Sequence, residues 1–313
     1  MIRVLLVAAF SLLLLAPALS PSDFYVNVAT QILIAAIFAL SLNLLVGYGG
    51  LISLGHAVYL GVSAYLTIWL VTRAGLSHLP AAVAAVVLTT AMSLLFGILA
   101  LRATGLGFLM ITLALGQILW GLAYRWVSVT GGDNGLSGFQ RPQPFGIDLA
   151  SPRTFYLMTV AVFACAFVLI AVLVRSTFGA GLRGVRDQPR RMQALGWHVW
   201  MVRLVAFVAA GFWGAVAGVL YAYYNQFVSP HVLALTNSAE ALLMVIAGGA
   251  GTLLGPVVGA VVVVMLKNVV SAYVTRWVML LGLVFVAIVA FMPEGLVPGI
   301  DRLRRRRRPA GTT

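Results

Sequence analysis

Residues 24–72 read FYVNVATQILIAAIFALSLNLLVGYGGLISLGHAVYLGVSAYLTIWLVT, a run of 49 residues without a formal charge. A helix that crosses a bilayer needs about 20 predominantly apolar residues. The run is therefore long enough for two membrane-spanning helices, and the glycines of GYGG at 47–50 mark the break between them. This stretch predicts a helical membrane protein.

The rest of the chain repeats the pattern in seven further charge-free stretches of 17 to 36 residues. Of the 313 residues, 62% are hydrophobic and 9% are charged, against about 25% charged in soluble domains; the mean hydropathy is +1.05. This composition excludes an ordinary soluble enzyme, a disordered chain and a nucleic-acid-binding domain. Runs such as SLLLLA and VVVVML lack the alternation of a transmembrane β-barrel.

We expect an all-α polytopic membrane protein with about ten spans, some of them interrupted or half-helices. The eighth is too short for a full crossing and fits a half-helix or a tilted one. Residues 1–20 fit either a cleaved signal peptide or, as we favour, a first transmembrane helix. A permease domain would then cover 21–300, and 301–313 would form a basic tail. The predicted spans are 3–20, 24–46, 55–71, 80–101, 108–124, 153–174, 203–224, 237–249, 256–272 and 277–292.

Arginine and lysine set the orientation, because cytoplasmic loops carry an excess of them. With both termini in the cytoplasm, the inner side holds 14 of these residues and the outer side holds 5. The opposite orientation would reverse that bias. The basic cluster at 302–308 follows the last span directly, so we assign it to anionic lipid headgroups and not to nucleic acid.

The segment 47–56, GYGGLISLGH, joins the second and third spans. Irregular backbone at membrane depth is tolerated where it is buried in protein or lines a cavity. The segment therefore fits a discontinuous helix beside a translocation path, and equally a tight cytoplasmic turn. His56 has no Cys, Asp or Glu nearby, which favours a structural role. If a path passes here, its candidate residues are Gly47, Gly49, Gly50, Ser53 and His56.

A second glycine-rich segment, LLMVIAGGAGTLLGPVVG at 242–259, predicts another interrupted helix. Gly248, Gly249 and Gly251 are further candidate path residues. Small residues one helical turn apart permit close helix packing in lipid. We therefore expect one packed helical face from Gly251, Gly255 and Gly259, and another from Gly214 and Gly218.

Glu240 is the only acid in the apolar region between Asp187 and Glu294. Asn237 and Glu240 approximate a capping box, which gives the acid a structural role. In the predicted topology Glu240 and Lys267 both lie toward the outer face, so an ion pair between them is the other interpretation.

The cytoplasmic loop 175–203 is long and basic. Pro189 fits the first turn of a short helix and Gly196 fits its end. We expect a helix of about two turns at the membrane surface, available to a partner. The candidate contacts are Arg183, Arg186, Asp187, Arg190 and Arg191.

Enzyme chemistry has no recognisable motif in this chain. The sequence lacks G-x-S-x-G, H-E-x-x-H and G-x-x-x-x-G-K-[ST]. A single cysteine, Cys165, excludes a disulfide framework and a cysteine metal cluster,. We expect no catalytic residue and no metal site, and any ATP used must be bound by another chain.

The segments GYGGLISLGHAVYLGVSAY, GGDNGLSG, LRGVRDQPRRMQALGW, EALLMVIAGGAGTLLGPVVGA and FMPEGLVPG occur in this order. Together they resemble permease subunits of bacterial branched-chain amino acid ABC importers of the LivM type. The resemblance runs from about Val26 to about Gly299. Relatives have an acidic Asn-Glu-like pair where this chain has Gln188 and Pro189, so the resemblance implies the position of the docking helix and not its detailed contacts.

The resemblance implies an inner-membrane complex with a second homologous permease, two ATPases that bind ATP and magnesium, and a soluble substrate-binding protein. This chain would contribute no catalysis. The same machine could carry urea, amides or other amino acids. A secondary transporter is a different class, and a single cap-like acid, Glu240, argues against it. The absence of clustered catalytic groups argues against a membrane-embedded enzyme.

Overall fold

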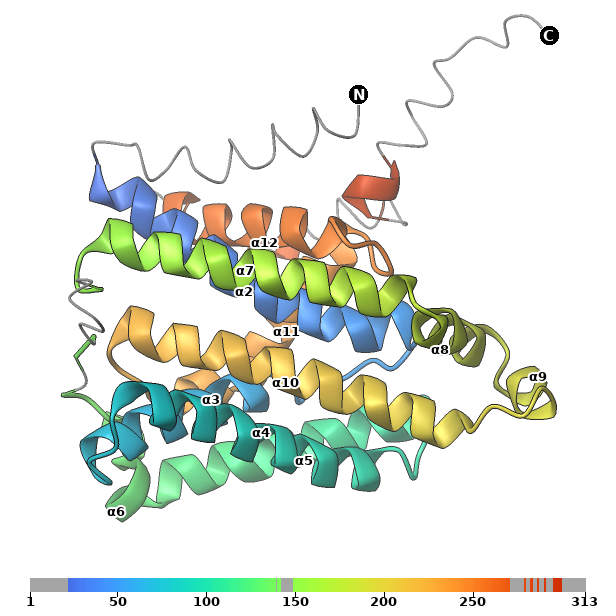
Figure 1. Cartoon of the computed structure of the whole chain (residues 1–313), viewed down its shortest axis with the longest axis horizontal. Coiled ribbons are helices and arrows are strands. Elements are labelled where there is room, and N and C mark those ends of the chain that lie inside the picture. Colours follow the sequence, from blue (N-terminus) through green and yellow to red (C-terminus); the bar gives the residue numbers. More distant parts are fainter. Residues whose placement is uncertain are drawn as a thin grey trace, which may run out of the picture.

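The computed structural model describes residues 22–138, 140–141, 149–270, 279, 282–283, 286, 290 and 295–299. Within these residues the chain is a bundle of helices running along one long axis (Figure 1). The all-α prediction is confirmed. The predicted spans 3–20 and 277–292 and the basic tail 301–313 lie outside the described residues, wholly or for the most part.

Five described helices are long and apolar enough to cross a membrane. Their ends fall within a few residues of the predicted limits, because charged or helix-breaking residues bound the apolar runs. The five are α2 (Asp23–Asn43), α4 (His78–Ala100), α5 (Leu106–Arg125), α7 (Pro152–Arg175) and α10 (Val199–Asn225). Helix α2 continues into a π-helical turn, η2 (Leu44–Tyr48).

Three shorter apolar helices also belong to the described part of the bundle. They are α3 (Ala57–Thr72), α11 (Leu235–Gly248) and α12 (Gly255–Met265), the last continuing into the π-helical turn η6 (Leu266–Val270). The irregular segments 49–56 and 249–254 separate α2 with η2 from α3 and α11 from α12. The two glycine-rich segments are thus breaks between helices, as the sequence predicts.

The centre of the bundle is formed by α2 and α10. In their most apolar stretches 78% of α2 and 61% of α10 is buried, against 22–28% in α4, α5 and α7. Helix α10 packs on α3, α4 and α2, while α12 and α7 pack on α2. The outer helices therefore present apolar side chains to lipid or to a partner subunit.

One helix was not expected. The basic loop contains α8 (Thr177–Asp187) as well as the expected short helix, α9 (Pro189–Ala194). The glycines 179, 181 and 184 lower the helix propensity of α8, which is why the sequence pattern missed it. A Cβ at these positions would meet Val174, Trp197 and Met192, so the glycines serve close packing.

At the opposite end of the bundle, the GGDNG segment folds as a turn around the 3₁₀ helix η3 (Gly132–Asn134). Leu136 then forms an isolated antiparallel bridge with Val228, with N–O distances of 2.8 and 3.1 Å. The bridge ties this loop to the segment that leads through the 3₁₀ helix η5 (Pro230–Leu233) into α11.

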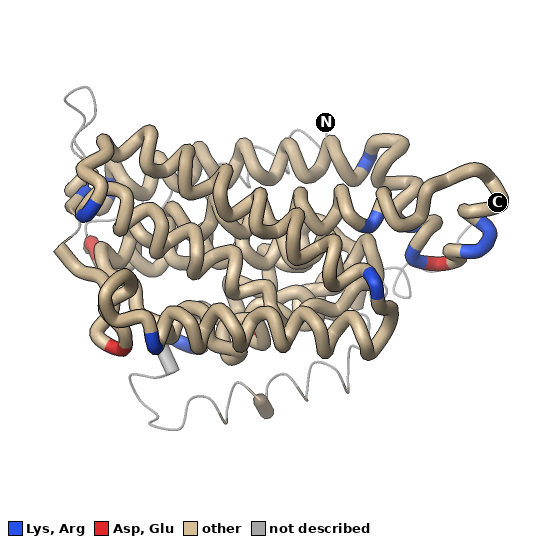
Figure 2. The backbone as a smooth tube through the Cα atoms, turned by 90° about the horizontal axis from the view of Figure 1, so that it is seen from below, with Lys and Arg blue, Asp and Glu red and all other residues tan. Residues whose placement is uncertain are grey.

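Charged residues lie at the two ends of the bundle and on α8 and α9, whereas the middle carries almost none (Figure 2). The exceptions are Glu240 on α11 and Lys267 on η6. The ends fit the predicted membrane orientation, with α8 and α9 on the cytoplasmic side.

Candidate functional site

The two helix breaks meet inside the bundle. Asn43, at the end of α2, accepts a hydrogen bond from the backbone N–H of Gly251 through Oδ1 (2.9 Å) and donates one to the carbonyl of Thr252 through Nδ2 (2.8 Å). A Cβ at Gly47 would meet the Gly251 backbone and Asn43 Oδ1. We call this contact among Asn43, Gly47, Gly251 and Thr252 the crossing.

Gly251 lies outside α12, which corrects the expectation of one helical face containing Gly251, Gly255 and Gly259. Gly251 has φ +80°, a left-handed conformation that favours glycine and turns the chain toward Gly47,. Gly255 is the first residue of α12 and packs on its own preceding loop at Gly249 and Thr252. The chain bends here because Thr252 Oγ1 donates to Gly249 O and accepts from Gly255 N.

Three of the other glycines lie at contacts between helices. A Cβ at Gly218 would meet the carbonyl of Leu60, and one at Gly259 would meet the carbonyl of Met244. Gly214 faces Tyr59, whose Cβ would lie 3.1 Å from an added Cβ. At these positions α10 approaches α3, and α12 approaches α11, closely.

Helix α8 reaches the crossing through one side chain. Arg186 Nη1 donates to the carbonyl of Gly47 (2.6 Å), and its Nε donates to the neighbouring Asp187 (2.8 Å). The Arg186 methylenes lie over Gly50, which has φ +65°. A side chain predicted to meet a partner therefore also holds the first helix break.

The remaining predicted docking residues differ in exposure. Arg183 is half-buried and donates to the carbonyl of Val174 (3.1 Å), whereas Arg190 and Arg191 are exposed on α9. Of the predicted docking residues, Asp187, Arg190 and Arg191 are thus exposed and make no contact with the helix breaks, whereas Arg186 is exposed in part and bonded to Gly47.

His56 lies away from the crossing, at the start of α3. Its Nε2 lies 2.8 Å from Ser41 Oγ, its ring stacks on Phe38 and it is fully buried. Ser53 is also buried. The backbone N–H of Ala57 donates to Ser238 Oγ (2.9 Å), which joins the start of α3 to α11. The contacts of His56 with Ser41 and Phe38 fit the structural role expected for it.

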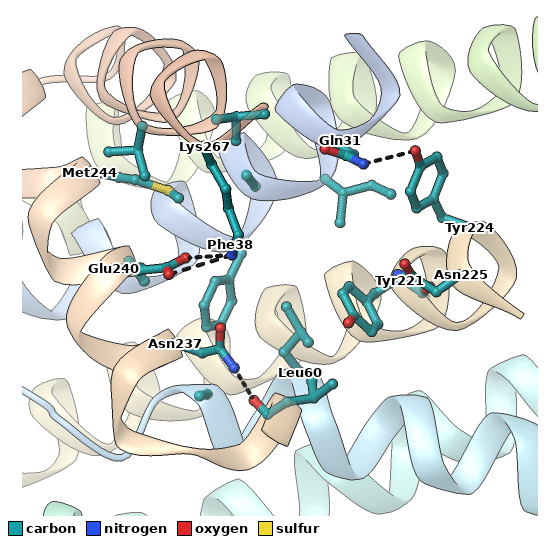
Figure 3. A pocket seen from close by; sticks show the side chains of 17 residues that line it. Gln31, Phe38, Leu60, Tyr221, Tyr224, Asn225, Asn237, Glu240, Met244 and Lys267 are labelled. Atoms are coloured by element: carbon teal, nitrogen blue, oxygen red, sulfur yellow. Dashed lines mark hydrogen bonds and ion pairs between the residues drawn. The ribbon is translucent and has the colours of Figure 1, made fainter. Parts of the chain in front are cut away.

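A cavity of about 250 Å³ lies beside α2, between α3, α10, α11 and α12. We call it the Glu240 pocket (Figure 3). None of the eight predicted path residues lines it. Sequence reasoning had singled out Glu240 and Lys267 but not the polar residues around them, because each is one polar residue in an apolar run. Those polar residues include Gln31, Tyr221, Tyr224 and Asn225; Asn237, which the sequence had indicated only as a helix cap, also lines the pocket.

Glu240 and Lys267 form an ion pair across the pocket, with Nζ–O distances of 3.2 and 3.4 Å. The capping-box interpretation is wrong, because the residue that caps α11 is Ala234 and Asn237 lies within the helix. Asn237 Nδ2 instead donates to the carbonyls of His231 and Val232.

A second polar connection crosses the pocket nearer its outer end. Asn268 Nδ2 donates to Gln31 Oε1 (2.8 Å), and Gln31 Nε2 donates to the hydroxyl of Tyr224 (2.9 Å). Three elements, η6, α2 and α10, are joined through Gln31.

Helix α2 places the pocket and the crossing in sequence along the bundle. Gln31 and Phe38 line the pocket, whereas Asn43 and Gly47 form the crossing. At 1.5 Å per residue, Gln31 and Gly47 are separated by roughly 24 Å along the axis. The pocket thus lies toward the end away from α8, and the crossing lies between it and α8. A path through this chain would be open at the pocket, toward the end away from α8, and closed at the crossing.

The sequence resembles a known family of transport proteins. The family profile described as branched-chain amino acid transport system / permease component matches residues 24–289. Two relatives, from Salmonella typhimurium and Escherichia coli, are named high-affinity branched-chain amino acid transport system permease protein LivM. Each is 27% identical over 296 aligned residues, which cover 87% of this chain and 70% of the relative.

A third relative, from Methanocaldococcus jannaschii, is named probable branched-chain amino acid transport permease protein LivM. It is 27% identical over 160 residues, which cover 44% of this chain and 46% of the relative. No solved structure gives a significant match. The family profile covers most of the chain, including both helix breaks, the basic loop and the Glu240 pocket. The chain therefore belongs to the family of permease components of branched-chain amino acid transport systems, and it is a membrane transport subunit and not an enzyme.

Proposed function

We propose that this chain forms one half of the translocation path of an ATP-driven importer of branched-chain amino acids. The observation that carries the proposal is that the crossing lies between the Glu240 pocket and α8. A cavity on one side of the membrane and a closed contact on the other correspond to one state of an alternating-access cycle. In this state the pocket faces outward, and the crossing closes the cytoplasmic half.

The second half of the path would come from a second, homologous permease. Helices α4, α5 and α7 expose most of their apolar surface, and such surface in a membrane protein meets lipid or another subunit. A soluble substrate-binding protein outside the membrane would deliver the amino acid to the outer end.

Two cytoplasmic ATPases would supply the energy and bind ATP and magnesium. Helices α8 and α9 are their docking site, because they project beyond the bundle and expose Arg190 and Arg191. The cytoplasmic surface would present this positive charge to an acidic or polar groove of the ATPase.

Reconstitution in liposomes tests the proposal. The chain alone should neither hydrolyse ATP nor accumulate leucine against a gradient, whereas the complex with its second permease, ATPases and binding protein should do both. Concentrative uptake by the chain alone, driven by an ion gradient, would establish a secondary transporter instead. Uptake of urea or an amide by the complete complex, without leucine uptake, would correct the substrate.

A further inference from the structure

The Glu240 pocket combines two kinds of lining. Glu240 and Lys267 place a carboxylate and an ammonium on neighbouring helical elements. Side chains of α2, α3 and α12 form an aliphatic wall that includes Ile34, Leu60 and Val264. The cavity volume of about 250 Å³ lies just below the range of about 300–1,000 Å³ typical of drug-sized ligands. This size suits a small metabolite.

Placing the ionised side chains of Glu240 and Lys267 between membrane helices costs free energy. Ionised side chains inside membrane segments are costly and are found where they face a cavity, a partner or each other. Here the pair is loose, with distances of 3.2 and 3.4 Å, and 47% of the Lys267 side chain and 20% of the Glu240 side chain remain exposed. Both groups can therefore accept a further ligand from the cavity side.

We propose that this pocket is a substrate-binding site that takes an aliphatic amino acid as its zwitterion; this proposal rests on the proposed transport function. The Glu240 carboxylate accepts hydrogen bonds from the α-ammonium, and the Lys267 ammonium donates to the α-carboxylate. The substrate side chain lies against the aliphatic wall.

The charge balance favours a zwitterion over either half of it. In the empty pocket the two protein charges neutralise each other, and a bound zwitterion gives each a partner of opposite sign while the total stays at zero. An amine or a carboxylate alone would leave one protein charge without its counterpart in a poorly hydrated site. The pocket therefore selects a zwitterionic amino acid over an amine or a carboxylate because these would leave Glu240 or Lys267 unpaired, and not only through apolar contact.

Cysteine protection tests occupancy directly. In a Cys165→Ala background, Val264→Cys places a thiol at the pocket and Val261→Cys places one on the exposed face of the same helix. Leu60→Cys gives a second pocket position from α3. The assembled permease–ATPase complex is labelled with N-ethylmaleimide in the presence of leucine, 3-methylbutylamine or 4-methylpentanoate.

Leucine should slow labelling at Val264→Cys and Leu60→Cys at concentrations at least tenfold lower than either analogue, and should leave Val261→Cys unchanged. Equal protection by all three compounds would show a simple apolar cavity. No protection by leucine at either pocket position would show that the substrate does not bind there. Either result overturns the proposal.

The ion pair is tested by neutralising both charges together. Glu240→Gln with Lys267→Gln keeps two polar side chains and leaves no unpaired charge. If the pair binds substrate, leucine uptake should fall at least tenfold while complex assembly and ATP hydrolysis stay within about twofold of the wild type. Wild-type uptake in this variant would make the pair a helix–helix bridge, which contradicts the proposal.

Failure of the pocket and failure of the proposed function give different results. A wild-type complex that hydrolyses ATP but takes up no leucine contradicts the function itself. A wild-type complex that takes up leucine normally, together with unprotected cysteines in the pocket, contradicts only the binding site.

Discussion

Asn43 joins the end of α2 to the second helix break, and nothing in the sequence around it indicates this role. It is buried, and both atoms of its amide are used, one by Gly251 and one by Thr252. The partners lie more than 200 positions away in the chain. In an apolar run one asparagine gives no sign of such a role, so neither periodicity nor charge could have found it.

Replacing this amide should loosen the crossing. Asn43→Ala removes two hydrogen bonds, each worth about 0.5–1.5 kcal/mol, and leaves the half-buried Gly251 N–H without its acceptor,. We expect a lower thermal unfolding temperature of the purified complex and reduced coupled uptake. Thr90→Ala is the matched control, because the Thr90 hydroxyl donates to the carbonyl of Val86 within the same helix, α4. Similar unfolding temperatures for both variants would contradict a role for Asn43 in holding the breaks.

At the scale of elements, the sequence predicts best what depends on composition alone. The limits of α4 and α7 fall within two residues of the predicted spans, because hydropathy and charge determine them. The sequence did not predict helix α8, because its glycines lower the helix propensity. It did not predict the crossing either, because that contact depends on two segments far apart in the chain meeting in space. Glycine spacing predicted helix packing at Gly255, where the structure instead has a packed turn.

Glycine at a close helix contact should be irreplaceable, whereas glycine on an open face should not. In Gly259→Ala the new methyl group meets the carbonyl of Met244, and we expect overpacking to cost about 1–3 kcal/mol,. In Gly121→Ala, on α5, the methyl group meets nothing within 4 Å. It should be neutral or slightly stabilising, because alanine favours helix more than glycine does. Thermal unfolding at matched membrane abundance compares them, and equal stability would show that α11 and α12 do not pack as described.

The docking surface of α9 can be tested apart from the crossing. Arg190→Glu with Arg191→Glu reverses exposed charge and touches no contact of the helix breaks. We expect normal membrane insertion and at least tenfold weaker ATPase association in a pull-down. Arg102→Glu, exposed at the same end of the bundle, is the control. Unchanged association would mean that the basic loop only sets the membrane orientation and does not bind the ATPase. Arg186 is unsuitable for this test, because its substitution would also release Gly47.

For the whole molecule, orientation follows from a sum over all loops and not from any one contact. The bias of 14 to 5 basic residues places α8 and α9 in the cytoplasm and the 131–138 loop outside,. The structure separates these regions to opposite ends of the bundle, as Figure 1 shows. The charge bias predicts which of the two ends faces the cytoplasm.

Labelling in intact cells tests that orientation. In a Cys165→Ala background, a membrane-impermeant maleimide should modify Ser137→Cys on the outer loop and not Gln193→Cys on α9; both positions are exposed. After cell lysis Gln193→Cys should react, which controls for its accessibility. The reverse pattern in intact cells would invert the topology and with it the direction in which the Glu240 pocket faces.

The side chain of Arg186 touches both the docking helix and the crossing, so the two are thermodynamically linked. If an ATPase shifts α8 away from Gly47, the first helix break loses a hydrogen bond and opening becomes easier. Reciprocity then requires that opening of the crossing change the affinity of α8 for the ATPase by the same factor. One guanidinium group is enough to carry this coupling, because no chain of intermediate residues lies between its two partners.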